Sequence, residues 1–231
     1  MKIFKYGLLI LSLCQSVMAN PSISNWTGLY SGLNLGYLKA SSILDAYNAN
    51  FLNQSYGSYH QDMNDDSFTI GLQLGFLKSF QPGWVIGLES DFTYPDTNAK
   101  FSLNDPINNA FDAFQLQNYL QGSVRIRAGV ATGRLLPYMT AGASLAGMAL
   151  HYRNETGDYY SRSKTQIGST VGTGIEYKLI NHLSGRIEYL YTYYKNRLTM
   201  GIANIDAINT YGTIGANLYT NTVRAAINYR F

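Results

Sequence analysis

The last nine residues of the sequence form an alternating pattern that ends in an aromatic residue. Apolar or aromatic side chains occupy every second position from Val223 to Phe231, and Arg224, Asn228 and Arg230 lie between them together with Ala226. Alternation with a period of two indicates a β-strand with one apolar and one polar face. This ending predicts a strand of a closed β-barrel whose apolar face contacts lipid.

The first 19 residues are predicted to be a cleaved secretory signal peptide. Lys2 and Lys5 precede a short apolar run, and Ala19 completes a cleavage pattern of small residues. An uncleaved anchor is the weaker alternative, because the run is shorter than the roughly 20 residues that a spanning helix requires. Cleavage between Ala19 and Asn20 leaves residues 20–231 as one barrel domain. The single cysteine lies in the removed segment, so the mature chain forms no disulfide.

Composition argues against membrane helices but not against a membrane barrel. Mean hydropathy is −0.12, and a barrel whose strands show lipid only every second side chain keeps such a value. The 20 tyrosines suit a membrane interface, and the 22 glycines relieve crowding inside a narrow barrel. Removing Lys2 and Lys5 from the 17 basic residues leaves 15 against 14 acidic residues. This near-neutral balance gives no indication of nucleic-acid binding.

Eight segments of the mature sequence alternate in the same way. They lie at about residues 27–38, 68–80, 84–94, 119–130, 136–150, 165–177 and 183–194, followed by the C-terminal segment. Each is long enough for a tilted spanning strand of roughly 9 to 11 residues. The segment 136–150 is the least decisive, since both of its faces are small and apolar. The predicted fold class is all-β, an eight-stranded antiparallel up-and-down transmembrane β-barrel.

The connections between these segments alternate between long and short along the chain. Short turns are predicted near residues 81–83, 131–135 and 180–182, long loops near 39–67, 95–118 and 195–217, and a loop of medium length near 152–164. This asymmetry is typical of outer-membrane barrels, with periplasmic turns and termini and extracellular loops. Two aromatic girdles are predicted: Trp26, Phe80, Trp84, Tyr138, Tyr177, Tyr229 and Phe231 at the turn end, and Tyr37, Phe68, Tyr94, Tyr119, Tyr193 and Tyr219 at the loop end. A soluble secreted barrel that binds a small ligand has no use for such girdles.

Several motifs resemble a known family. They are Trp26-Thr27-Gly28-Leu29-Tyr30 with Gly32 and Gly36-Tyr37, Leu136-Pro137-Tyr138 with Gly142, Gly174-Ile175-Glu176-Tyr177, Arg186-Ile187-Glu188-Tyr189, and the terminal Phe231. Together they resemble the small outer-membrane barrel family that includes the opacity-type proteins and the surface antigens of alphaproteobacteria. The resemblance implies the outer membrane of a Gram-negative bacterium, and an assembly signal in Tyr229 and Phe231 that the barrel-assembly machinery recognises. It implies no catalytic residues.

The inward face of the predicted barrel carries the residues that could perform chemistry. It holds Glu89, Asp91, Arg125, Arg127, Glu176, Arg186, Glu188, Arg224 and Arg230. Opposite charges on neighbouring strands can pair, and a buried charge requires such a partner. Because eight strands enclose barely enough space for their own side chains, a salt-bridged lumen charge network that fills the barrel is the first interpretation. A narrow or gated ion path is the alternative.

Function is therefore expected in the loops or in the lumen rather than in an active site. We predict no catalytic residue, no metal site and no cofactor. A hydrolase or acyltransferase would need a serine and a histidine near the outer rim, and no motif supports the nearby candidates, His151 with Ser161 or Ser163. The first hypothesis is a structural and surface-interaction protein whose loops contact a host or matrix ligand. The second is a small porin-like channel for ions or small solutes. Expected partners are outer-membrane lipid and lipopolysaccharide and the barrel-assembly machinery, with no nucleic acid.

Overall fold

The structure is a computed structural model in which part of the chain is described. The backbone is described for residues 25–51, 54–95, 97–105, 110–153, 159–202 and 211–231. Side chains are described for residues 25–41, 66–95, 120–147, 163, 165–194 and 218–231. The predicted signal peptide and the cleavage site between Ala19 and Asn20 lie outside these residues, so cleavage stays a prediction.

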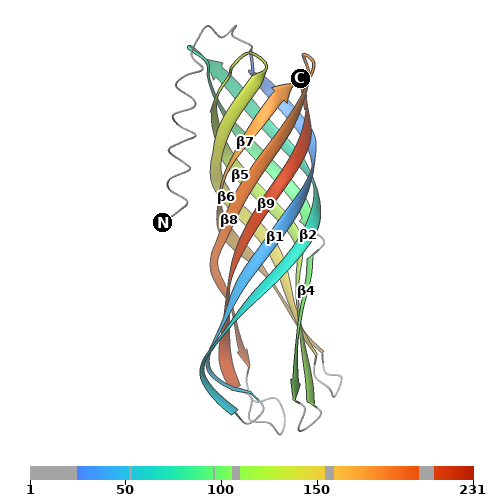
Figure 1. Ribbon diagram of the computed structural model, residues 1–231, viewed down its shortest axis with the longest axis vertical. Helices are drawn as coiled ribbons and strands as arrows, with labels where there is room; N and C mark the ends of the chain where they lie inside the picture. Colours follow the sequence, from blue (N-terminus) through green and yellow to red (C-terminus); the bar gives the residue numbers. More distant parts are fainter. Residues whose placement is uncertain (1–24, 52–53, 96, 106–109, 154–158, 203–210) are drawn as a thin grey trace.

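One antiparallel sheet closes into a barrel (Figure 1). Its strands are β1 (Gly28–Phe51), β2 (Gln54–Phe80), β3 (Trp84–Pro95), β4 (Thr97–Asp105), β5 (Ala110–Val130), β6 (Leu135–Arg153), β7 (Tyr159–Lys178), β8 (Leu183–Ile202) and β9 (Tyr211–Arg230). Sequence neighbours pair except for β3 and β4, which both pair with β5; β1 pairs with β9, and the pairing of β3 with β5 closes the ring. Strands β3 and β4 are separated by one residue and pair with successive parts of β5, so together they form the third of eight spanning strands. The predicted fold class is confirmed.

The three short turns lie at one end of the barrel, together with the end of β9 (Figure 1). In the turn between β2 and β3, the Gly83 amide donates to the Phe80 carbonyl at 2.9 Å. Gly133, in the turn between β5 and β6, has a φ of 59°, a conformation that favours glycine. We call this end the short-turn end and the opposite one the long-hairpin end.

At the long-hairpin end the strands run much further than the sequence predicts. The stretch 39–67, predicted to be a loop, is a continuation of β1 and β2, which pair as far as Phe51 with Gln54. The same correction applies to most of the stretches 95–118, 152–164 and 195–217. The prediction was wrong here because a strand outside lipid needs no apolar face. The hydrogen-bonded ladder continues while the hydrophobic alternation disappears.

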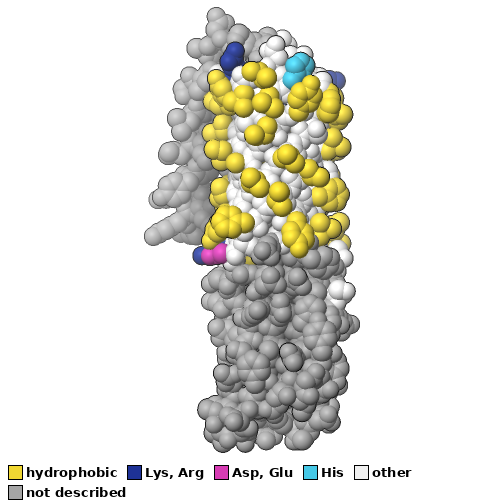
Figure 2. Space-filling view, turned by 90° about the vertical axis from the view of Figure 1, so that its right-hand side faces the viewer, with side chains coloured by type: hydrophobic (Ala, Val, Ile, Leu, Met, Phe, Trp, Pro, Cys, Tyr) yellow, Lys and Arg dark blue, Asp and Glu magenta, His cyan; other side chains and the backbone are white. Residues whose placement is uncertain are grey.

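The exterior of the barrel is apolar and the interior is polar. Leu33, Leu35 and Ile126 are 62%, 63% and 61% exposed, whereas Asn34 and Arg125, which alternate with them, are 1% and 0% exposed. Figure 2 shows apolar side chains distributed over the described surface that faces the viewer. Exposed apolar side chains on every second residue are the pattern of a lipid-facing barrel. Among the described residues, no helix has the length and apolar character needed to cross a membrane.

The two predicted aromatic girdles are present with two exceptions. At the short-turn end Phe80, Trp84, Tyr177, Tyr229 and Phe231 are exposed, and at the other end Tyr37, Phe68 and Tyr94 are exposed. Tyr193 and Tyr219 stack on the exterior with ring centroids 5.1 Å apart, and the side chain of Tyr119 lies outside the described residues.

The assignment of Trp26 and Tyr138 to a girdle was wrong, because they are 0% and 4% exposed inside the barrel. Trp26 precedes β1 and folds across the mouth. Tyr138 has the same inward parity along β6 as Thr140 and Ser144, which are also buried.

Candidate functional site: the filled lumen

Glu89 lies at the centre of the lumen, fully buried on β3. The Tyr30 hydroxyl donates a hydrogen bond of 2.5 Å to its Oε2 atom. Its carboxylate lies within ion-pair distance of four guanidinium groups, those of Arg125, Arg127, Arg186 and Arg224. A single buried carboxylate therefore holds arginines from β5, β8 and β9 together.

Glu188 and Asp91 extend this cluster toward the long-hairpin end. Arg224 donates to Glu188 at 2.6 Å, and the Tyr138 hydroxyl donates to the other carboxylate oxygen at 2.8 Å. Asp91 accepts hydrogen bonds from Arg125 at 2.7 Å and from the Ser123 hydroxyl at 2.6 Å. Each acid thus has one arginine and one hydroxyl donor at short range.

Glu176 forms the part of the cluster nearest the short-turn end. Arg127 donates to its carboxylate at 2.8 Å, and the Ser184 hydroxyl donates at 2.6 Å. The Asn228 amide donates at 3.2 Å, and the Arg230 guanidinium lies 3.6 Å away. Because charge-assisted hydrogen bonds are about twice as strong as neutral ones, these contacts offset the cost of burying the carboxylate.

The strand register explains why opposite charges meet. Glu89 lies directly opposite Arg125 on β5, Glu176 opposite Arg186 on β8, and Glu188 opposite Arg224 on β9. Directly opposite side chains on one face of an antiparallel pair are close enough to interact. The contact from Arg186 to Glu89 then crosses the lumen from β8 to β3.

All nine of the charged residues that the sequence predicted on the inward face lie in this network. The four acids are at most 5% exposed and the five arginines at most 6% exposed. Several uncharged members were missed by the sequence analysis, namely Tyr30, Tyr138, Gln73, Ser184 and Asn228. Gln73 links two regions, because its side chain accepts from Arg186 at 2.6 Å and also contacts Asn228. Their inward parity on the strands was the available signal.

Glycines opposite the inward tyrosines make room for them. Tyr30 lies opposite Gly75, Tyr138 opposite Gly174, and Tyr194 opposite Gly168. A Cβ atom built on Gly75 would lie 2.4 Å from the Tyr30 ring, and one on Gly174 would lie 2.5 Å from the Tyr138 hydroxyl. Such separations exclude any side chain at these glycines unless the ring moves. This packing helps to fill a narrow barrel completely.

An apolar layer closes the lumen at the short-turn end. It consists of Trp26, Tyr30, Leu77, Val85, Ala131 and Leu136, all 7% exposed or less. The Trp26 amide donates to the Ser79 hydroxyl at 2.9 Å, and Arg230 donates to the Trp26 carbonyl. Lys178 and Arg230 contact the Trp26 ring at 4.7 and 4.8 Å from its centroid. We call this layer the Trp26 cap.

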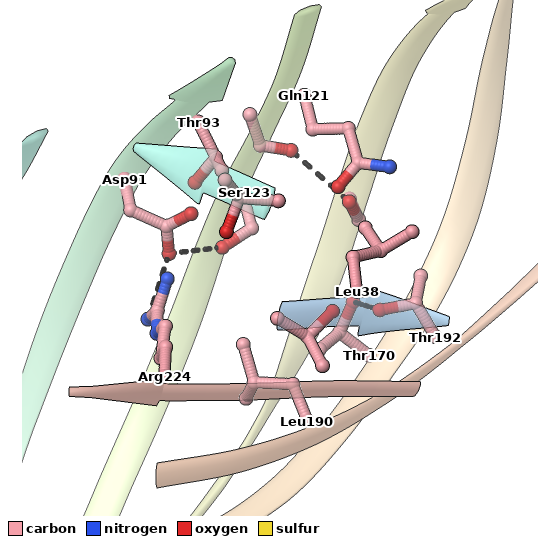
Figure 3. A pocket seen from close by; sticks show the side chains of 13 residues that line it. Leu38, Asp91, Thr93, Gln121, Ser123, Thr170, Leu190, Thr192 and Arg224 are labelled. Carbon is pink, nitrogen blue, oxygen red and sulfur yellow. Dashed lines mark hydrogen bonds and ion pairs between the residues drawn. The ribbon is translucent and has the colours of Figure 1, made fainter. Parts of the chain in front are cut away.

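A small chamber lies on the other side of the charged layer (Figure 3). Its volume is about 30 Å³, which is enough to hold at least one water molecule. Hydroxyl groups of Thr69, Thr93, Ser123, Ser144, Thr170, Thr192 and Thr222 line it, together with Gln121, Leu38 and Leu190. The Asp91–Arg224 ion pair forms part of its wall. Beyond it, Ala146, Tyr194 and Leu218 form a further buried apolar cluster.

The described residues contain no group of His, Cys, Asp and Glu side chains arranged to hold a metal ion. His151 and Ser161 lie opposite each other in the ladder between β6 and β7, but their side chains lie outside the described residues. The residues predicted to form an assembly signal are at the short-turn end: the Phe231 amide donates to the Leu29 carbonyl at 2.9 Å, and the Phe231 ring meets the Tyr229 ring edge-on with centroids 5.3 Å apart.

A closed eight-stranded barrel with an apolar exterior and a charged, filled interior defines a small outer-membrane protein. The chain belongs to the outer membrane protein beta-barrel domain family, whose model matches residues 7–231. The protein is therefore placed in the outer membrane of a Gram-negative bacterium, with periplasmic turns and extracellular hairpins.

Relatives and solved structures agree with this assignment. The chain is 31% identical over 208 residues to the 25 kDa outer-membrane immunogenic protein of Brucella abortus, covering 90% of this chain and 80% of the relative. It resembles the crystal structure of OprG from Pseudomonas aeruginosa, with a TM-score of 0.53, 10% identity, and coverage of 89% and 97%. The outer-membrane protease OmpT of Escherichia coli gives a TM-score of 0.54 at 9% identity, with coverage of 92% and 99%. At such identities the structures support the fold alone.

Proposed function

We propose that this protein is a non-enzymatic, non-conducting anchor that presents its extracellular hairpins to partners outside the cell. The observation that carries the proposal is the lumen, in which four carboxylates and five arginines are buried and mutually paired. Opening a path for ions would require these charges to separate in a low-dielectric interior, which is costly. The Trp26 cap adds an apolar barrier between these charges and the short-turn end.

The hairpins support the surface-interaction part of the proposal. Strands β1 and β2 remain paired from the lipid-level residues Gly36 and Thr69 to Phe51 and Gln54. The segments available to a partner are therefore continuous with barrel strands. The name of the Brucella abortus relative, an outer-membrane immunogenic protein, is consistent with a surface that meets the exterior.

Planar-bilayer recording tests the non-conducting part. Purified wild-type protein is expected to give no steady current above that of protein-free membranes, because the charged layer and the Trp26 cap leave no continuous water path. Steady single-channel currents would contradict the anchor proposal and favour the small porin-like channel. That alternative is supported by the polar chamber. The excess of one arginine in the lumen would make such a channel selective for anions.

Hairpin trimming tests the interaction part. Leu44 and Gln61 are directly opposite in the ladder between β1 and β2. Replacing residues 45–60 with Asn-Gly should therefore shorten the hairpin without changing the register below it. Bacteria that express this variant are expected to lose most of their adhesion to cultured animal cells and to immobilised extracellular-matrix extract.

The matched control trims a different hairpin at an equivalent point. Ser102 and Ala113 are opposite in the ladder between β4 and β5, so residues 103–112 can be replaced in the same way. This control is expected to retain adhesion. Both variants must show the gel shift between unheated and boiled samples that marks a folded barrel. Full adhesion by the 45–60 variant with a correctly folded barrel would rule out this hairpin as the contact surface.

A further inference from the structure

Charge is distributed unevenly along the barrel axis. Of the 14 acidic residues, four face the lumen and the other ten lie in the long connections, so none remains for the short turns or for residues 20–27. The periplasmic end instead carries Lys78 at the end of β2, Arg134 in the turn between β5 and β6, and Lys178 at the end of β7. We call these three residues the basic rim.

The basic rim lies at the depth of the lipid headgroups. Lys78 is exposed, and its ammonium group lies 5.5 Å from the centroid of the Phe80 ring. Lys178 directly follows Tyr177, which is 45% exposed in the same aromatic girdle. Because aromatic girdles mark the membrane interface, Lys78 lies next to the headgroups, whereas the ammonium of Lys178 lies at the barrel mouth, 4.7 Å from the centroid of the Trp26 ring. Figure 2 shows basic side chains at this end of the described surface, and at its opposite edge an acidic side chain with a basic one beside it.

Apolar side chains accompany the bases. Leu135 follows Arg134 and is 39% exposed, and Leu179 and Ile180 follow Lys178 and are 47% and 66% exposed. A partner that satisfies both kinds of side chain must combine an anionic group with hydrocarbon. A phospholipid does this, whereas the carboxylates of peptidoglycan have no acyl chain beside them.

Lys178 lies near the positive charge of Arg230, and Glu176 in the lumen opposes the effect of that charge. Its backbone amide donates to the Arg134 carbonyl at 2.9 Å, and its ammonium donates to the Asn25 carbonyl at 2.6 Å. Lys178 lies beyond the spanning part of β7, and partial burial together with the charge of Arg230 lowers the pKa of its ammonium, against an opposing effect of Glu176. An external anion would relieve this repulsion.

We infer that the basic rim binds the headgroups of anionic phospholipids in the inner leaflet of the outer membrane, in preference to zwitterionic ones. The inference uses the family and its orientation and does not depend on the proposed surface interaction. Each base near an anionic membrane surface contributes an attraction equivalent to about a fivefold preference. The preference should fall as salt is added, because the headgroups are exposed to solvent.

Tryptophan fluorescence gives a direct test, because the chain has only two tryptophans. Trp84 is 48% exposed in the periplasmic girdle and is the direct ladder partner of Phe80, whereas Trp26 is buried. Protein is reconstituted in phosphatidylcholine vesicles that contain a small fraction of brominated phosphatidylglycerol or brominated phosphatidylcholine. The wild type is expected to be quenched at least about twofold more by the phosphatidylglycerol probe.

Variants locate this preference on the barrel. Lys78→Gln/Arg134→Gln/Lys178→Gln should equalise the two probes, and Lys78→Gln/Arg134→Gln, which leaves the Trp26 contact of Lys178 intact, should give an intermediate value. The matched control Lys39→Gln/Lys164→Gln/Lys195→Gln removes three charges from the strands toward the long-hairpin end and should keep the wild-type ratio of quenching by the two probes. Equal quenching in the wild type, or equal loss in the control, would overturn the inference. The inference would also be overturned if Lys78→Gln/Arg134→Gln/Lys178→Gln kept its lipid preference and instead lost its retention on peptidoglycan sacculi.

Discussion

Replacing Glu89 with alanine is expected to lower the free energy of unfolding by about 3 to 5 kcal/mol, the usual cost of removing one partner from a buried ion pair. The carboxylate of Glu89 is shared by Arg125, Arg127, Arg186 and Arg224. Its removal leaves five buried arginines facing three acids, and the repulsion between them should admit water. Denaturant unfolding in lipid vesicles measures the loss, and bilayer recording should detect small currents absent from the wild type.

Three further variants separate charge from packing. Glu89→Gln keeps the shape of the side chain and should still destabilise the barrel, because the charge is lost. Glu89→Gln/Arg186→Gln restores the charge balance and should recover part of the stability. Asp66→Asn changes an exposed acid and should shift the free energy of unfolding by no more than about 0.5 kcal/mol. A Glu89→Ala protein as stable as Asp66→Asn would show that the network does not hold the barrel together.

The faces of the strands were predictable from the sequence because a period of two leaves only two choices. A charged residue such as Arg125 cannot face lipid, so the side chains that alternate with it, including Val124 and Ile126, must do so. The short turns then fix which strands are neighbours. Local cross-strand pairs such as Glu188 with Arg224 follow directly.

Contacts across the lumen were not predictable in the same way. Whether Arg186 on β8 reaches Glu89 on β3 depends on the stagger of the closed barrel, which no local pattern records. Trp26 illustrates a second limit, because an aromatic residue near a strand end suits a girdle and a cap equally well. The choice depends on the space at the mouth, which Leu77, Val85 and Leu136 help to define.

Deleting Phe231 is expected to reduce the amount of protein assembled in the outer membrane severalfold, while secretion across the inner membrane continues. In the folded barrel this residue contributes little: its side chain is 67% exposed, and its amide forms one backbone hydrogen bond to Leu29. Loss of one such bond costs roughly 1 kcal/mol. A large loss in the cell would therefore reflect recognition by the assembly machinery rather than instability.

Two measurements on the same variant distinguish these causes. Refolding of the Phe231 deletion from urea into detergent should proceed nearly as in the wild type, whereas its level in isolated outer membranes should fall. Phe231→Tyr keeps an aromatic end and should assemble normally. Phe80→Ala removes a comparably placed girdle aromatic, 44% exposed, and should also assemble. If the deletion refolds poorly in detergent, its effect in cells is one of stability, and Tyr229 and Phe231 lose their assignment as the assembly signal.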